Sequence, residues 1–363
     1  MDKPSLLSVD VVIPVYNSPD IVKRCIDSVI AHLNQSIHTV WIQDDASNVE
    51  TREMLDGLTY TQVHVHHALR NLGYGQSVNE AVSRSDADLA LVLNSDTELR
   101  ENFLPTLCNA LQQDEKLAIV SPVHDSFFHY HPSQYQRQTG GYITTYRFQG
   151  YGFLVRRKLF MSIGGFDQEF GRGYYEDTDL GRRLIEQGWR VGIHADCYIH
   201  HKGGASFGRG QDFRALVARN RAYYFFRYPD AKKNILLISC KYSLLDLSPE
   251  LTNNLNVVMQ RGGSVYWLTP LSSPQLSCLQ MHNVSANLFN MLRLMLRGQS
   301  RADKRISAVW MLAGVPWVWQ ILLKGFVRLN NLNYKNGQVD LNFYVSNDRH
   351  SLFCSDSVSN FLL

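Results

Sequence analysis

The sequence predicts an α/β protein built on a mostly parallel sheet with helices on both of its faces. The composition is globular, because 45% of the 363 residues are hydrophobic and 19% are charged. Apolar runs of strand length alternate with amphipathic stretches of helix length through roughly the first hundred residues, in the order βαβαβαβ. Polar side chains follow three of these strands, at the edge where α/β sheets bind ligands.

Each predicted element has its own signal. The strands are short apolar or β-branched runs that end in turn residues, and the helices repeat their apolar residues at the helical period. We expect strands at residues 9–15, 39–43, 62–66 and 87–93, and helices at 21–33, after 47 and near 77–83.

The strand ends carry side chains that could bind a ligand. Asn17 follows the first strand, Asp44 and Asp45 end the second, and Asn94 and Asp96 follow the fourth. Taken singly, each is well explained as a turn former or helix cap. Because parallel strands end at one edge, all of them together favour a polar site there.

The length predicts two domains. We place the first at residues 1–230 and a small accessory α/β domain at 231–363, where strands at 234–239 and 264–269 flank a helix at 249–261. Residues 231–363 hold 13 Lys and Arg against 6 Asp and Glu, whereas residues 1–230 hold 23 against 27. The acidic residues 1–230 are suited to binding a cation, and the basic residues 231–363 are suited to contact with an anionic surface.

Several classes of protein are disfavoured. The six cysteines are scattered without a C-x-x-C spacing, which indicates reduced thiols rather than disulfides or a zinc site. Residues 1–8 lack the pattern of a signal peptide, so we expect a cytoplasmic protein. The loop at 70–75 lacks the spacings of an ATPase or dinucleotide-binding loop, and no motif predicts a nucleic-acid partner.

An acidic turn at residues 174–184 is the strongest candidate for catalysis. Glu176, Asp177 and Asp179 lie within four residues, at the start of a predicted helix. Acids in a first turn complement the helix dipole, and Asp179 can pair with Arg182 or Arg183. Adjacent carboxylates also repel each other, which raises a pKa and can prepare one of them as a general base.

Seven short motifs in a fixed order resemble those of family-two glycosyltransferases of GT-A fold. The similarity extends to the branch that builds bacterial surface polysaccharides with rhamnosyl- and galactofuranosyl-transferases, and it covers about residues 9–228. The motifs are Val11-Val12-Ile13-Pro14-Val15-Tyr16-Asn17, Asp44-Asp45-Ala46-Ser47, Asn71-Leu72-Gly73, Leu93-Asn94-Ser95-Asp96, Gly164-Gly165-Phe166-Asp167, Tyr175-Glu176-Asp177-Thr178-Asp179-Leu180 and His200-His201-Lys202-Gly203-Gly204-Ala205-Ser206.

The resemblance implies an inverting, metal-dependent transfer of sugar from a nucleotide-diphospho-sugar to a glycan or lipid-linked glycan acceptor. Asn94-Ser95-Asp96 stands where the family has its D-x-D motif, so Asp96 is expected to face Mg²⁺ or Mn²⁺. His200 is expected to make a second contact with the metal or the diphosphate. The donor nucleotide is expected to contact Pro14, Tyr16, Asn17, Asp45, Arg70, Asn71 and Asn94.

The resemblance also assigns the acids. Asp177 is expected to be the base that deprotonates the acceptor hydroxyl, while Glu176 orients the acceptor and raises the pKa of Asp177. Asp179 is expected to be structural. The stretch at 124–147 is rich in Tyr, His and Gln, which suits either sugar recognition or a mobile loop.

Two other functions stay open at this point. One is an inactive sugar-nucleotide or glycan-binding module of the same fold, which the intact acids disfavour. The other is a nucleotidyltransferase that makes nucleotide sugars, which the absence of a glycine-rich activating loop disfavours.

Residues 291–328 raise the question of membrane contact. Arg293, Arg297, Arg301 and Arg305 recur every fourth residue, on one face of a helix if it is continuous. Residues 306–323 contain three tryptophans and no charge, and they are read here as an apolar helix. A peripheral site on the inner face of the cytoplasmic membrane, a buried packing helix and a true span are all compatible with this pattern.

Overall fold

The computed structural model describes residues 7–124, 131–203, 210–239, 247–270, 275–296, 305–312, 314–330, 333–336 and 343–344. Contacts divide the chain into two compact units, Met1–Pro132 with Arg137–Arg227, and Ser133–Gln136 with Tyr228–Leu363. The sequence analysis placed a single boundary after residue 230. Each unit has its own sheet and its own apolar core.

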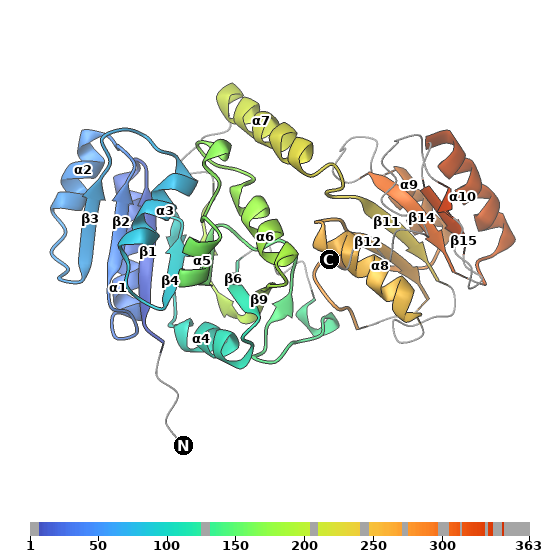
Figure 1. Cartoon of the computed structure of the whole chain (residues 1–363), viewed down its shortest axis with the longest axis horizontal. Coiled ribbons are helices and arrows are strands. Elements are labelled where there is room, and N and C mark those ends of the chain that lie inside the picture. Colours follow the sequence, from blue (N-terminus) through green and yellow to red (C-terminus); the bar gives the residue numbers. More distant parts are fainter. Residues whose placement is uncertain are drawn as a thin grey trace, which may run out of the picture. The chain divides into compact units, whose positions relative to one another are not determined.

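The first unit alternates strands and helices as the apolar pattern predicts (Figure 1). Its elements are β1 (Val9–Val15), α1 (Pro19–Leu33), β2 (Val40–Asp44), α2 (Val49–Asp56), β3 (Val63–His67), α3 (Tyr74–Arg84), β4 (Leu89–Leu93), β5 (Thr97–Glu98), α4 (Leu104–Gln113), β6 (Leu117–Val123), β7 (Ile143–Thr144), β8 (Gly152–Arg156), α5 (Arg157–Ser162), α6 (Glu176–Glu186), β9 (Arg190–Tyr198), β10 (His200–His201) and α7 (Gln211–Arg227).

Eight of these strands form one mixed sheet in the order β3-β2-β1-β4-β8-β6-β9-β7. Strands β1 to β4 pair in parallel, and β8 runs antiparallel to both β4 and β6. Strand β9 is parallel to β6, and β7 is antiparallel to β9. Six strands therefore share one direction, which confirms the predicted α/β class with a mostly parallel sheet.

Helices cover both faces of the sheet because successive strand residues point to opposite sides. Val11 and Ile13 belong to a core cluster that also takes in the buried residues of α1 and α4. Val12, between them, belongs to a second cluster formed with α3, α5 and α6. The carboxyl ends of the parallel strands are left uncovered by this packing and are free to carry a site.

The second unit is a separate α/β layer. Its elements are β11 (Asn234–Ile238), α8 (Pro249–Gln260), β12 (Val265–Thr269), β13 (Met281–Ser285), α9 (Leu288–Leu296), β14 (Ile306–Met311), α10 (Trp317–Asn330), β15 (Asn333–Asn336) and β16 (Phe343–Tyr344). The sheet order is β13-β12-β11-β14-β15-β16, parallel except for the last pair. The segment Ser133–Gln136 belongs here, where Tyr135 bridges Leu276.

Two predictions for this unit are wrong. Residues 306–323 are not one helix, because Ile306–Met311 is a central strand and helix α10 begins only at Trp317. Arg293 and Arg305 do not share a helix, since α9 ends at Leu296 and Arg305 directly precedes β14. Arg297 and Arg301 lie outside the described residues. A fully buried parallel strand and an apolar helix look alike in hydropathy, which explains the error.

The described helices were also compared with the dimensions of a bilayer. None of them combines the length and the apolar character that crossing a membrane requires.

The core packing leads to a stability prediction. Phe153 of β8 is fully buried and packs edge-on against Phe148, with 4.9 Å between ring centroids. Phe153→Ala is expected to lower the free energy of unfolding by about 3–5 kcal/mol. Phe226→Ala is the matched control, because Phe226 is 84% exposed, and its effect is expected to stay within about 0.5 kcal/mol. Equal shifts of the two variants in denaturant unfolding would contradict this packing.

Candidate active site

Two adjoining cavities open at the carboxyl edge of the first unit's sheet. The larger has a volume of about 310 Å³ and is lined by Asn94, Asp96, Tyr151, Glu176, Asp177 and His201, among others. The smaller has a volume of about 50 Å³ and is lined by Tyr16, Asp45, Asn71, Gly73, Ser77 and Arg172, among others. Pro14 and Tyr74 line both cavities, so the two meet at these residues.

One wall of the larger cavity carries Asp96 and His201. Strands β5 and β10 pair so that His201 lies opposite Thr97, next to Asp96. The Nε2 atom of His201 is 3.2 Å from Oδ1 of Asp96, and the Asp96 side chain is only 8% exposed. His201 also stacks on Tyr151, with 5.1 Å between ring centroids. The sequence analysis chose His200 for this wall, but the structure places His201 on it.

Asn94 lies on the same wall with an oxygen that has no partner in the protein. Its backbone N–H donates to the carbonyl of Tyr151 at 2.9 Å, which holds the turn after β4. Its side-chain Oδ1 is buried and accepts no hydrogen bond. Because an unpaired buried oxygen is costly, this atom is suited to a ligand that enters the cavity.

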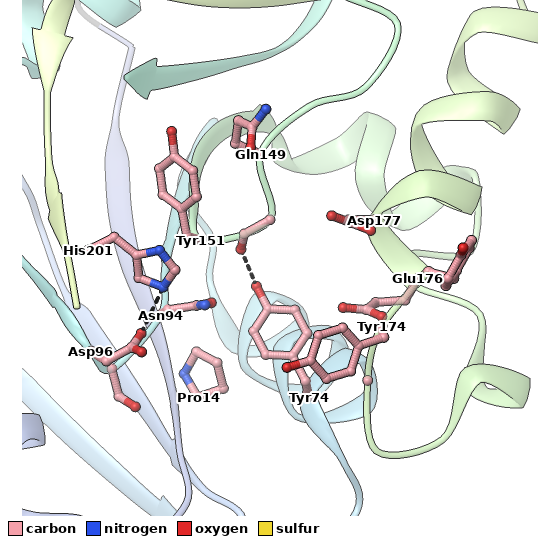
Figure 2. A pocket seen from close by; sticks show the side chains of 14 residues that line it. Pro14, Tyr74, Asn94, Asp96, Gln149, Tyr151, Tyr174, Glu176, Asp177 and His201 are labelled. Carbon is pink, nitrogen blue, oxygen red and sulfur yellow. Dashed lines mark hydrogen bonds and ion pairs between the residues drawn. The ribbon is translucent and has the colours of Figure 1, made fainter. Parts of the chain in front are cut away.

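The opposite wall is the start of helix α6, where Glu176 and Asp177 lie (Figure 2). The two residues before the helix, Tyr174 and Tyr175, have φ values of +73° and +77°. Non-glycine residues in this region cost about 1–3 kcal/mol each, so the surrounding structure must hold the turn. Backbone strain of this kind is concentrated at functional sites.

Asn220 of α7 is the side chain that holds this turn. It is fully buried, and its Nδ2 donates to the carbonyls of Phe170 and Gly173 at 2.7 Å and of Tyr174 at 3.0 Å. Its Oδ1 accepts from Arg219 at 3.0 Å, so the amide is satisfied on both sides. The start of α6 is thus fixed from outside the cavity.

Asp177 is oriented by its own helix and by a glycine across the cavity. Its Oδ1 accepts from the backbone N–H of Thr178 at 2.6 Å. Its Oδ2 faces Gly150, where an added Cβ atom would lie only 3.0 Å from that oxygen. A side chain at position 150 would therefore press on the carboxylate, and glycine leaves it room.

Glu176 is a buried carboxyl with one unpaired oxygen. Its side chain is 7% exposed and Oε2 has no hydrogen-bond partner. Burial, followed by the charge of Asp177, raises the pKa of Glu176 to about 8. The sequence argument had Glu176 raising the pKa of Asp177, and in the structure the pKa of Glu176 is itself raised.

Asp179 has the structural role that the sequence predicted. It is fully buried, and its carboxylate pairs with Nε of Arg183 at 2.7 Å and with Arg227 at 3.2 Å. Asp179 is not among the residues that line either cavity.

The smaller cavity is shaped by Asp45. Its carboxylate accepts hydrogen bonds from the backbone N–H groups of Leu72 and Gly73, the second at 2.9 Å. Burial raises the pKa of Asp45, while these two hydrogen bonds act in the opposite sense. Asp45 therefore holds the 71–73 loop in place as well as lining the cavity.

Gly73 joins this loop to the turn before the acids. Its φ is +85°, and an added Cβ atom would lie 2.4 Å from the carbonyl oxygen of Gly171. The N–H of Tyr74 donates to the carbonyl of Arg172 at 3.4 Å. Only glycine permits this contact, so the smaller cavity and the acidic wall are built on touching loops.

Three residues predicted for the site are not among those lining either cavity: Asn17, Arg70 and His200. Asn17 ties a turn, since its N–H donates to Ser47 and its Oδ1 accepts from the N–H of Asn48, both at 2.8 Å. Arg70 is exposed to solvent.

Besides His201, the side chains that the sequence analysis left out of the cavity walls include Tyr74, Tyr151 and Arg172. Tyr74 donates from its hydroxyl to the carbonyl of Gly150 at 2.7 Å. Tyr151 stacks on His201, and the guanidinium of Arg172 lies 5.9 Å from the ring centroid of Tyr16. Each of the three is next to a glycine in the sequence, which is the signal that could have found them.

The sequence was also compared with protein families and with known proteins. Residues 10–168 match the family described as "Glycosyl transferase family 2". The matched segment makes up less than half of the chain, and it is similar to glycosyl transferase family 2. The match indicates a glycosyltransferase as the enzyme class, and the observed sheet confirms the predicted α/β class with mostly parallel strands.

Individual relatives are distant. An N-acetylglucosaminyl-diphospho-decaprenol L-rhamnosyltransferase of Mycobacterium tuberculosis is 27% identical over 210 residues, covering 46% of this chain and 67% of the relative. Glycosyltransferase GlyG of Streptococcus pneumoniae is 24% identical over 114 residues, covering 31% of this chain and 38% of the relative. The solved mannosyltransferase PcManGT from Pyrobaculum calidifontis, in complex with GDP-Man and Mn²⁺, has 17% identity and a TM-score of 0.48, covering 62% of this chain and 65% of that one.

The residues present suit a hard divalent cation held jointly with a ligand. Among the described residues, no three His, Cys, Asp or Glu side chains group closely enough to hold a metal ion alone. Asp96 and the unpaired Oδ1 of Asn94 supply oxygen atoms to one wall, next to the ring nitrogen of His201. Mg²⁺ is commonly bound through one or two carboxylates plus phosphate oxygens, and this wall fits that pattern.

The buried Glu176 leads to a pH prediction. Because its pKa is raised to about 8 in the folded protein, the folded state favours the protonated form, and the ionised form costs stability as pH rises from about 5 to about 8. Glu176→Gln removes this cost. We expect the melting temperature of Glu176→Gln, relative to that of the unmodified protein, to increase across this pH range.

The exposed Glu169 gives the control for this measurement. Glu169→Gln is expected to leave the difference in melting temperature constant with pH. A difference for Glu176→Gln that is flat or falls between pH 5 and pH 8 would show that Glu176 is not a buried, unpaired acid.

Proposed function

We propose that this protein is an inverting, metal-dependent glycosyltransferase that moves a sugar from a nucleotide-diphospho-sugar to an acceptor hydroxyl. The observation that carries the proposal is that Asp96 and Asp177 lie on opposite walls of one cavity, as Figure 2 shows. An acceptor hydroxyl on the second wall would attack the anomeric carbon from the side opposite to the diphosphate, which would leave toward the first wall. That arrangement inverts the anomeric carbon.

The donor would occupy both cavities. The smaller cavity, between Tyr16, Asp45 and Asn71, would take the nucleoside. The diphosphate would reach Asp96, Asn94 and His201, with Mg²⁺ or Mn²⁺ held between them. A bound cation would neutralise charge that develops on the leaving diphosphate. In this proposal His201 takes the role that the sequence analysis assigned to His200.

Asp177 would act as the general base. Its Oδ1 is engaged by the start of α6 and its Oδ2 faces Gly150 across the cavity, where an acceptor hydroxyl would enter. Glu176, whose pKa is raised, would be protonated near neutral pH and could donate a hydrogen bond to the acceptor or the sugar. Two adjacent carboxyls would thus have separate roles, set by their burial.

The proposed acceptor is a glycan or a lipid-linked glycan in bacterial surface polysaccharide or glycolipid synthesis. The support is the relative from Mycobacterium tuberculosis, whose name states rhamnosyl transfer to N-acetylglucosaminyl-diphospho-decaprenol. The proposed location is the cytoplasm, at the inner face of the membrane, where such an acceptor would be met. Within the stretch at 124–147, Tyr142 is buried and would not contact an acceptor. Any acceptor recognition by this stretch would therefore depend on its other residues.

Nucleotide binding and turnover together test the proposal. UDP, GDP, dTDP and CDP are each added with and without Mn²⁺, and the melting temperature of the protein is measured. A nucleotide present at about a hundred times its Kd should raise the free energy of unfolding by about 2.7 kcal/mol. We expect one nucleotide to give a metal-dependent shift that Asp96→Ala abolishes and Asp177→Asn retains. Sugar conjugates of the nucleoside diphosphate that binds are then tested for release of that diphosphate. Asp177→Asn should slow this release by about 10²–10⁴-fold.

Asp212→Asn is the matched control, since Asp212 is an exposed acid in the first turn of another helix, α7. It should leave both readouts unchanged. Nucleotide binding without any turnover in the unmodified protein would favour the inactive binding module instead. No shift with any nucleotide would contradict the donor assignment itself.

A further inference from the structure

Helices α9 and α10 of the second unit expose an unusual share of the protein's large apolar side chains. Of the thirteen large hydrophobic residues that are exposed in the described chain, nine lie on these two helices. They are Leu288, Phe289, Leu292 and Leu296 of α9 and Trp317, Val318, Ile321, Leu322 and Leu329 of α10. Exposed apolar residues that are concentrated in this way mark interaction surfaces more often than residues scattered singly.

The core of the unit does not account for these side chains. Met291, Leu294 and Met295 of α9 and Leu323 and Val327 of α10 enter one buried cluster with strands β11, β12 and β14. Both helices therefore pack on the same face of the sheet. The nine exposed residues lie on the sides of the two helices that do not enter this cluster, and these sides are here called the α9–α10 face.

The charges on the α9–α10 face are all positive. Arg293, Lys324 and Arg328 are exposed, and neither helix contains Asp or Glu. In the part of the chain that the structure describes, none of these three cations forms an ion pair. Their charges are available to an anionic partner.

From this surface we infer that the α9–α10 face docks on an anionic lipid bilayer. Apolar residues with a tryptophan among them, edged by Lys and Arg, are what a helix needs to lie in the interface of a membrane. Each basic residue near an anionic surface strengthens the attraction to it. The inference stands apart from the proposed transfer reaction, because no residue of the α9–α10 face lines either cavity.

A second copy of the chain fits the α9–α10 face less well. A two-fold dimer brings the same patch of both copies together. Arg293, Lys324 and Arg328 would then meet a surface whose charges are also all positive, with no carboxylate on either helix to neutralise them. A bilayer with anionic headgroups supplies both the apolar phase and the opposite charge.

The test is co-sedimentation of the full chain with vesicles. Vesicles of phosphatidylcholine with about a third phosphatidylglycerol are compared with pure phosphatidylcholine, at low and high salt. We expect binding to the anionic vesicles that weakens at high salt and is much weaker on the neutral ones. Phe289→Glu and Ile321→Glu, on one helix each, should each weaken binding by about tenfold or more.

Phe226→Glu is the matched control for Phe289→Glu, because the two phenylalanines are 84% and 73% exposed and Phe226 lies on α7. It should leave vesicle binding unchanged. The nucleotide-dependent melting shift should be the same in all three variants, so loss of lipid binding is distinguishable from failure of the proposed enzyme activity.

Three results would overturn the inference. One is a failure to bind anionic vesicles at low salt. Another is an equal loss of binding in Phe226→Glu and Phe289→Glu. The third is a dimer in light scattering that Phe289→Glu converts to a monomer, which would assign the α9–α10 face to a second copy.

Discussion

The backbone contact between Gly73 and Gly171 is the constraint on which the candidate site depends. An added Cβ atom at position 73 would lie 2.4 Å from the carbonyl oxygen of Gly171, so the two loops touch without a side chain between them. Asp45 holds the first loop through its N–H groups, and Asn220 holds the second through three of its carbonyls. The smaller cavity and the acidic wall are thereby locked to each other.

Several features that oppose folding are concentrated at this wall. Tyr174 and Tyr175 have left-handed backbone conformations, and Glu176 is a buried acid with an unpaired oxygen. Each feature opposes folding, and the hydrogen bonds of Asn220 offset part of that cost. What results is a pair of adjacent carboxyls in different surroundings, one nearly buried and one facing the cavity. Separation of this kind is how a site obtains an acid and a base from similar side chains.

The sequence could predict what depends on local pattern. Strand β1 at Val9–Val15, the start of α6 at Glu176 and the pairing of Asp179 with Arg183 follow from apolar period and charge spacing. It could not choose between His200 and His201, because the β5–β10 ladder decides which of two successive side chains faces the cavity. It also misread Ile306–Met311, since a buried strand and an apolar helix share one hydropathy pattern.

The central claim is that one nucleotide occupies both cavities with its diphosphate on the Asp96 wall. Anomalous diffraction at the manganese edge, from crystals grown with Mn²⁺ and the nucleoside diphosphate that binds, tests it most directly. The account predicts one strong peak beside the Asp96 carboxylate, between it and the diphosphate, with the base near Tyr16 and Asp45. A nucleotide bound outside these cavities, or a manganese ion on the Glu176–Asp177 wall, would contradict it.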